Sequence, residues 1–265
     1  MTVFTLPTVR RRHPRLITHI LRPLIAVLGM TLVSFPYFLL RGVADNVGMP
    51  HREGSILPLE RVLGAGALPS ERLQQFIGAP AAIVWGAFGV YALFAVTPVV
   101  VFAYIGATRP HLLVSLFTMY AVLMYGAVVF FLLMPTAPPW MAVTLDHKYQ
   151  TVAVDPNKLA AFPSLHVAMP AAMAFWLASE RMRTQAFAFW VLTLLTGVTV
   201  VYLGEHYVVD AIGGLLLAYT AVRVARHTRF TGWLLRGFAP MEESVSLTPR
   251  AVDDLVPAEA VAASP

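Results

Sequence analysis

The sequence predicts an all-α, polytopic membrane protein with six transmembrane helices. Its 265 residues are 58% hydrophobic and only 12% charged, and the mean hydropathy is +0.69. A soluble domain of this length needs more polar surface than this composition provides. Six apolar runs, separated by short segments that carry most of the charged residues, give the expected number of helices.

Each expected helix is an apolar run close to the length that a bilayer requires, which is about 20 residues. The fourth run is the shortest, and we expect it to be tilted or to lie where the bilayer is thin. The six runs cover residues 16–40, 79–105, 112–134, 165–178, 186–203 and 207–225.

The segments between and beyond the runs divide the chain further. Residues 42–78 mix leucines with Glu and Arg, which predicts one or two short amphipathic helices at the membrane interface; a solvated connection is the alternative. Residues 135–164 begin with three prolines in five positions and predict a stiff outer loop. We expect 1–15 to be a basic N-terminal segment, 16–225 to be the catalytic membrane domain, and 226–265 to be a largely disordered tail.

The basic residues indicate how the chain crosses the membrane. The net charge is +5 and the pI is about 9.7, but the arginines flank the apolar runs and do not form a face for nucleic acid. Twelve Lys and Arg fall on one side of the six runs and 6 on the other. We therefore expect both termini in the cytoplasm and residues 42–78 and 135–164 outside, in a bacterial plasma membrane. The chain has no cysteine, which excludes disulfides and thiolate chemistry.

His206 and Asp210 are four residues apart in the last apolar run. A helix places such residues on one face, with the carboxylate within reach of the imidazole. A carboxylate partner fixes the histidine tautomer and makes the far nitrogen a better nucleophile or base. An unpaired charge inside a membrane helix costs about 2.5–3.5 kcal/mol, so the pair indicates a function, and a structural lock between helices is the alternative.

Ser164 and His166 open the fourth apolar run, in the stretch FPSLH. The unpaired amides of a helix start, together with the Ser164 hydroxyl, are suited to bind an anion. His166 lies in the same first turn, where it can exchange a proton with that anion. An ordinary helix start with an interfacial histidine is the alternative, but both motifs open on the same membrane side, which favours one shared site.

Three kinds of chemistry fit these residues. Two imidazoles suit phosphoryl transfer through a phosphohistidine, in which one attacks phosphorus and the other protonates the departing oxygen. A metal site formed by His166, His206 and Asp210 is a second possibility, although divalent metals usually have more carboxylate ligands. A transporter or scaffold that uses the His–Asp pair as a proton relay or lock is the third.

The paired motifs FPSLH and HYVVD resemble those of the type 2 phosphatidic acid phosphatase superfamily. The stretches PTAPPW, FPSLHVA and YLGEHYVVDAIGG are most similar to the branch of inositolphosphotransferases that make inositol phosphorylceramide. The resemblance covers about residues 42–225 and implies a six-span helical core with its active site at the outer face. It also implies that His206 is the nucleophile, Asp210 its activator, His166 the general acid and Ser164 a phosphate ligand.

The basic residues of the superfamily pattern are missing. The first motif, a lysine separated by six residues from an Arg-Pro pair, is absent, because the only Arg-Pro pairs are at 22–23, inside the first run, and at 109–110, on the expected cytoplasmic side. Val200 stands where an arginine usually occurs six residues before the nucleophile. The positive charge that phosphoryl transfer requires must come from elsewhere. The candidate substrate ligands beside Ser164 are Lys148, Lys158 and Tyr207, and Arg41 and Arg52 are the next cations considered.

We therefore expect a membrane lipid phosphatase or phosphotransferase that cleaves a lipid phosphoester at the outer face. The acceptor is water in a phosphatase, and an alcohol such as an inositol or lipid hydroxyl in a transferase. The mechanism requires neither a metal nor an organic cofactor, and no nucleic-acid partner is expected. The lipid, the acceptor and the oligomeric state stay open at this stage.

Overall fold

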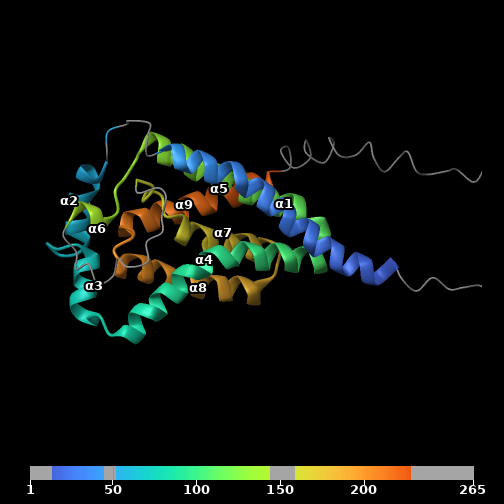
Figure 1. Cartoon of the computed structure of the whole chain (residues 1–265), viewed down its shortest axis with the longest axis horizontal. Helices are drawn as coiled ribbons and strands as arrows, with labels where there is room; N and C mark the ends of the chain where they lie inside the picture. The colour runs from blue at the N-terminus through green and yellow to red at the C-terminus, as the bar shows by residue number, and fades with distance from the viewer. Residues whose placement is uncertain (1–13, 45–49, 51, 144–158, 228–265) are drawn as a thin grey trace, which may run out of the picture.

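The described residues of the chain fold into helices and form no strand, which confirms the all-helical class. The computed structural model describes residues 14–44, 50, 52–143 and 159–227. Figure 1 shows the helices in chain order, which are α1 (Pro14–Ala44), α2 (Glu53–Leu63), α3 (Pro69–Ile77), α4 (Ala81–Thr108), the 3₁₀ turn η1 (Pro110–Leu112), α5 (Leu113–Leu133), α6 (Pro139–Ala142), α7 (Leu165–Ser179), α8 (Arg183–Tyr202) and α9 (Val208–Arg226).

Five of the described helices are long and apolar enough to cross a membrane: α1, α4, α5, α8 and α9. The remaining expected span is α7, which has only 15 residues. At a rise of 1.5 Å per residue it extends about 22 Å, less than the roughly 30 Å of a hydrocarbon core.

The short helix α7 is the centre of the bundle. It packs against α4, α5, α8 and α9, and most of its residues are buried. Ala168, Ala171 and Ala172 are fully buried, and their small side chains let the neighbouring helices approach closely. The outer helices instead expose apolar residues such as Leu32 and Leu194, which is the surface that a bilayer covers. Because protein surrounds α7, the irregular backbone before it is tolerated at this depth.

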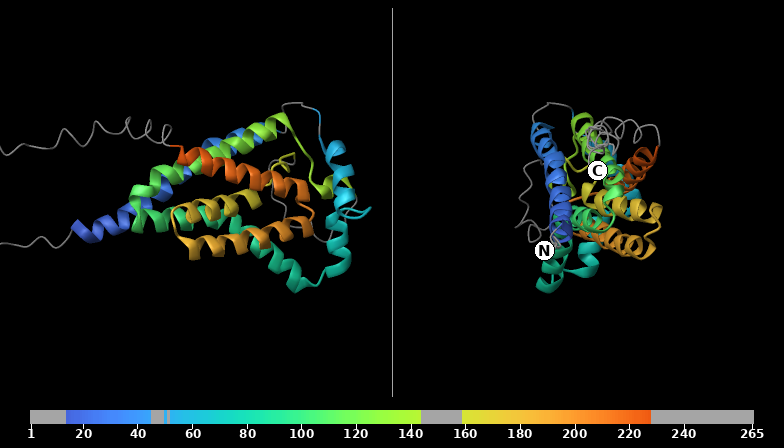
Figure 2. Two further views of the ribbon diagram at one scale, coloured as in Figure 1. Left: turned by 180° about the vertical axis from the view of Figure 1, so that it is seen from behind. Right: turned by 90° about the vertical axis from the view of Figure 1, so that its right-hand side faces the viewer.

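Three short helices, α2, α3 and α6, lie across one end of the bundle (Figures 1 and 2). Residues 64–68 join α2 to α3 in the segment where one or two amphipathic helices were expected. Hydrogen bonds tie α3 to the end of α8: Gln74 Nε2 donates to the Tyr202 carbonyl at 2.8 Å, and the Tyr202 hydroxyl donates to the Gly78 carbonyl at 2.8 Å. This end of the bundle is where the motif residues gather.

Several expectations concern residues outside the described ranges. The basic N-terminal segment lies almost wholly in residues 1–13, and the C-terminal tail in residues 228–265. Residues 144–158, inside the expected outer loop, are also not described.

Candidate active site

A tight turn between α8 and α9 presents His206. Gly204 has a φ of 74°, a conformation that glycine adopts without strain. The amides of Glu205 and His206 both donate to the Val200 carbonyl, at 3.0 and 3.2 Å. The Trp140 amide of α6 donates to the Gly204 carbonyl at 3.2 Å, so α6 holds the other side of the turn. His206 is therefore fixed through its own backbone and through that of its neighbours.

The first turn of α9 carries Asp210, which is fully buried. Its Oδ2 accepts a hydrogen bond from the Tyr207 amide at 2.8 Å, which caps the helix. Its backbone carbonyl accepts from the Ser164 amide at 3.0 Å, which joins the start of α9 to the start of α7. The two motif segments, distant in the sequence, therefore meet directly.

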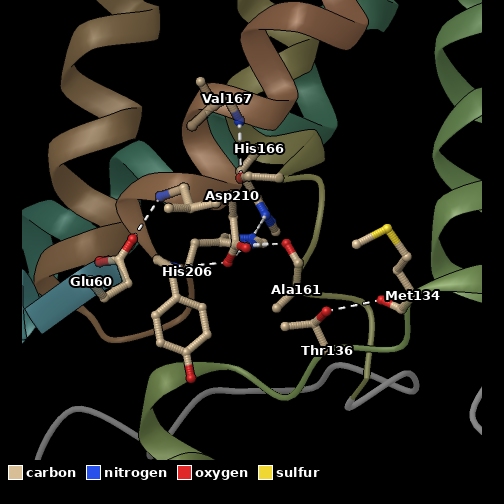
Figure 3. A network of polar contacts seen from close by, with 11 residues as sticks. Glu60, Met134, Thr136, Ala161, His166, Val167, His206 and Asp210 are labelled. Carbon is tan, nitrogen blue, oxygen red and sulfur yellow. Dashed lines mark hydrogen bonds and ion pairs between the residues drawn. The ribbon is translucent and has the colours of Figure 1, made fainter. Parts of the chain in front are cut away.

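The ring of His206 is held through its Nδ1 atom (Figure 3). Nδ1 lies 2.9 Å from the Ala161 carbonyl oxygen and 3.5 Å from Asp210 Oδ2. A carbonyl oxygen can only accept, so Nδ1 must carry the hydrogen. The Ala161 segment is itself fixed, because the Ala161 amide donates to the Thr136 carbonyl at 3.1 Å. Nε2 of His206 is consequently the nitrogen that bears a lone pair.

His166 faces that lone pair from the first turn of α7. Its Nδ1 lies 3.0 Å from Nε2 of His206, a hydrogen-bond distance (Figure 3). Because Nε2 of His206 accepts, Nδ1 of His166 must donate. The His166 ring also packs against two aromatic rings of α4, with centroid distances of 4.2 Å to Tyr91 and 4.6 Å to Phe94. The geometry thus fixes which nitrogen of each imidazole holds a proton.

The two histidines line a small cavity of about 70 Å³. Arg41, near the end of α1, and Glu205, next to His206, contribute its charged side chains. Its aromatic wall consists of Tyr37, Tyr91, Phe94, Phe131 and Trp140. A cation, a carboxylate and two imidazoles therefore share one pocket at the end of the bundle near α6.

The other candidate ligands lie elsewhere. Ser164 is fully buried and its hydroxyl accepts from the Val167 amide at 3.4 Å, so it caps α7 from within the protein. Tyr207 is also buried, and neither residue lines the cavity. Lys148 and Lys158 are outside the described residues. Of the arginines considered next, Arg41 lines the cavity and Arg52 does not.

Two kinds of residue in the pocket have no role in the interpretation of the sequence. Glu205 had a signal, because it stands directly before His206 in a polar stretch. Tyr91 and Phe94 had none, because aromatic residues are common in apolar helices and only the fold brings them to His166.

The possible metal ligands do not converge. His166 approaches Nε2 of His206, whereas Asp210 lies beside Nδ1 on the opposite edge of the ring. Within the described ranges, no three His, Cys, Asp or Glu side chains form a group that could hold a metal ion. His166 and Asp210 therefore lie at opposite edges of the His206 ring, and the three residues do not form a ligand cage.

Comparison with known proteins gives one match. The family model described as the PAP2 superfamily matches residues 55–224. No curated protein and no solved structure matches the chain. The matched range contains His166, His206 and Asp210, whereas Arg41 lies before it.

Proposed function

Because the chain belongs to the PAP2 superfamily, we propose that it is an integral membrane lipid phosphatase or phosphotransferase with His206 as its nucleophile. The observation that carries this proposal is the hydrogen bond of His206 Nδ1 to the Ala161 carbonyl, at 2.9 Å, which leaves the lone pair on Nε2, the nitrogen that faces His166. An oriented, neutral imidazole is the form in which a histidine attacks phosphorus.

The first chemical step forms one bond and breaks one. Nε2 of His206 attacks the phosphorus of the lipid phosphoester, and the bond from phosphorus to the leaving oxygen breaks. His166 acts here in its doubly protonated form: it gives its Nδ1 proton to that oxygen and becomes neutral, so the lipid leaves as an alcohol. The negative charge of Asp210, 3.5 Å from Nδ1 of His206, stabilises the positive ring that carries the phosphoryl group.

The second step returns the protein to its starting state. The acceptor oxygen attacks the phosphorus of the phosphohistidine, the bond from phosphorus to Nε2 of His206 breaks, and the acceptor proton passes to Nδ1 of the now neutral His166 ring. Water gives a phosphatase, and an alcohol gives a transferase. Glu205 lines the same pocket and can accept a hydrogen bond from an alcohol acceptor. Transfer of an inositol-phosphate-type head group, which the motif resemblance implies, is the transferase form of the proposal.

Arg41 is the cation that we assign to the transferring phosphoryl group. Its position in the pocket of both histidines supports this role, and a guanidinium can bind two phosphoryl oxygens at once. Lys148 and Lys158 stay as proposed additional ligands. We propose that Ser164 and Tyr207 hold the site in place without contacting substrate. Ser164 caps α7, the helix of His166, and Tyr207 directly precedes the first turn of α9.

The orientation of the protein is part of the proposal. The pocket lies near the end of the bundle where α2, α3 and α6 cross it, and the distribution of arginines favours the outer face for that end. The termini are then cytoplasmic, in a membrane that we propose to be a bacterial plasma membrane.

Phosphate release tests the proposal. Detergent-purified protein is incubated with a panel of lipid phosphates, with and without EDTA, as wild type, His206→Ala and His111→Ala. His111 is exposed in η1, away from the pocket, and serves as the matched control. We expect release by wild type and His111→Ala in both conditions, inhibition by vanadate, and no release by His206→Ala.

Other outcomes separate the alternatives. Release that disappears with EDTA would favour a metal-dependent hydrolase. If no release occurs, phosphodiester lipids are offered together with candidate alcohols, and a product that appears only with the alcohol identifies a transferase. If no product forms under any condition and vanadate does not bind to the protein, a transporter or scaffold is favoured.

A further inference from the structure

Glu60 of α2 reaches across to the first turn of α9. Its Oε1 accepts a hydrogen bond from the Val209 amide at 2.7 Å, although the two residues are 149 positions apart (Figure 3). Glu60 is 1% exposed, so the contact is shielded from solvent. The first turn of the helix that carries Asp210 is therefore capped by a side chain from another helix.

In α2 an acidic side chain is buried while apolar side chains beside it are exposed, which is unusual for a helix that packs on the surface of a bundle. Leu59 and Val62 beside Glu60 are exposed, whereas the carboxylate points inward. Burying a carboxylate costs free energy unless hydrogen bonds compensate for the lost water. The apolar neighbours would dock the helix at lower cost, so the inward carboxylate indicates a specific task at α9.

The amide that donates to Glu60 belongs to the residue directly before Asp210. Val209 directly precedes Asp210, whose Oδ2 lies 3.5 Å from His206 and whose carbonyl accepts from the Ser164 amide at the start of α7. The first amides of a helix have no partner within the helix, so this turn frays unless it is capped. A displaced turn would move the Asp210 carboxylate and the start of the His166 helix together.

We propose that Glu60 is a positioning residue for phosphoryl transfer, which holds the first turn of α9 so that Asp210 and His206 keep their alignment with His166. This inference rests on the proposed function, and it gives the α2 helix a part in the reaction. Glu60 does not line the pocket and acts through the α9 backbone.

The test compares three substitutions of Glu60 with one matched control. Glu60→Ala removes the acceptor, Glu60→Gln keeps an oxygen at the same length, and Glu60→Asp keeps the charge but shortens the side chain. The control is Glu71→Ala, because Glu71 Oε2 accepts from the Leu68 amide at 2.7 Å and so caps α3 in the same way, away from α9. Each variant is checked for folding by thermal unfolding in detergent.

Two readouts are taken. At saturating lipid phosphate we expect kcat to fall about tenfold or more in Glu60→Ala and Glu60→Asp, with KM little changed, because misplacement by about 1 Å weakens the chemical step more than binding. Glu60→Gln should restore kcat to within about threefold of wild type, since its amide oxygen accepts the same N–H. Hydrogen–deuterium exchange should be faster at Val209 in Glu60→Ala and unchanged there in Glu71→Ala.

The proposal is overturned if folded Glu60→Ala keeps the wild-type kcat, or if Glu60→Gln loses as much kcat as Glu60→Ala. If Glu60→Ala does not fold, kcat is compared between Glu60→Asp and Glu60→Gln. The proposal is then overturned if Glu60→Asp keeps the wild-type kcat or if Glu60→Gln loses as much kcat as Glu60→Asp. Exchange is measured without turnover, so an unchanged rate at Val209 refutes the positioning role even if no lipid phosphate is a substrate. Absence of turnover in wild type counts only against the proposed function.

Discussion

Nδ1 of His166 lies 3.0 Å from Nε2 of His206, so the two nitrogens that act in the proposed reaction are hydrogen-bonded to each other. The nucleophilic lone pair is covered by the donor proton, and a phosphorus atom bonded to Nε2 does not fit in that space. Substrate binding must therefore separate the two rings. The cavity beside the two rings is small, about 70 Å³.

His166 should matter most when the leaving group is poor. A lipid alkoxide needs a proton as it departs, whereas nitrophenolate departs without one. We expect His166→Ala to lower kcat/KM for a lipid phosphate by about 10²–10⁴-fold, the usual contribution of a general acid, and to affect p-nitrophenyl phosphate much less.

His206→Ala provides the comparison, because loss of the nucleophile should abolish both activities. Equal losses for the two substrates in His166→Ala would show that His166 only shapes the pocket. The measurement is initial-rate kinetics on the two substrates side by side.

Arg41 should be needed for the phosphoryl group rather than for the fold. Its guanidinium lines the pocket from the end of α1. We expect Arg41→Gln to lower kcat by about 10²–10³-fold, which is the loss seen when one donor to a transition-state charge is removed, and to weaken inhibition by vanadate. Arg41→Lys should recover part of the activity, since it restores the charge without the paired donors.

Arg52→Gln is the matched control for Arg41, because Arg52 directly precedes α2 and does not line the pocket. Its kinetics and its vanadate inhibition should equal those of wild type. If Arg41→Gln behaves like Arg52→Gln, the phosphoryl group takes its charge from another residue, and Lys148 and Lys158 become the next substitutions.

The sequence predicts the local parts of this site well and the long-range parts poorly. The spacing of His206 and Asp210 predicts that the two side chains approach each other, but not how. The prediction places both on one face of a helix, whereas His206 lies in the turn before α9, which begins at Val208, and this turn brings its ring to Asp210. The Ala161 carbonyl, which lies closer to Nδ1 than Asp210 does, depends on a backbone pairing with Thr136 that no pattern of residue types reveals. Similarly, hydropathy places Arg41 only at the end of an apolar run, and the packing of α1 brings it to the pocket.

The hydropathy pattern also locates α7 but not its role. Its apolar residues predict a short, tilted span, and only the structure shows that protein surrounds it. An apolar side chain is equally suited to lipid and to a neighbouring helix, so composition does not separate the two environments.

Glu60 should make the stability of the fold depend on pH. Burial raises the pKa of its carboxyl above the ordinary value of 4.5, hydrogen bonds from the Val209 and Val208 amides act in the opposite direction, and the negative charge of Asp210 raises it further. The folded protein therefore binds this proton more tightly than the unfolded chain does. Stability from this group is fully present below pH 4.5 and decreases as pH rises through the pKa of the folded state.

Glu60→Gln cannot ionise and keeps the hydrogen-bond acceptor. Thermal unfolding of wild type and Glu60→Gln, measured from acidic to neutral pH, should show wild type losing stability relative to the variant as pH rises, with a constant difference at higher pH. The charged groups near Glu60, chiefly Asp210, are the same in both proteins and cancel in the comparison. A difference that increases in favour of wild type as pH rises would contradict the assignment.

Gly214 permits the close contact between α9 and the start of α7. A Cβ atom at this position would overlap the Ser164 carbonyl oxygen and lie 3.3 Å from the Ala168 amide nitrogen. Both are backbone atoms, so no side-chain rotation relieves the overlap. We expect Gly214→Ala to lower the free energy of unfolding by about 1–3 kcal/mol, the usual cost of overpacking.

The control for Gly214 is Gly86→Ala in α4, where an added Cβ would meet nothing within 4 Å. Alanine there should stabilise by roughly 0.5–1 kcal/mol or leave stability unchanged, because it restricts the unfolded chain. Gly214→Ala should also lower kcat at temperatures where it remains folded, because the overlap pushes Asp210 and His206 away from His166. Wild-type stability together with wild-type kcat in Gly214→Ala would mean that the two helices separate freely, and the alignment of the histidines would then need another source.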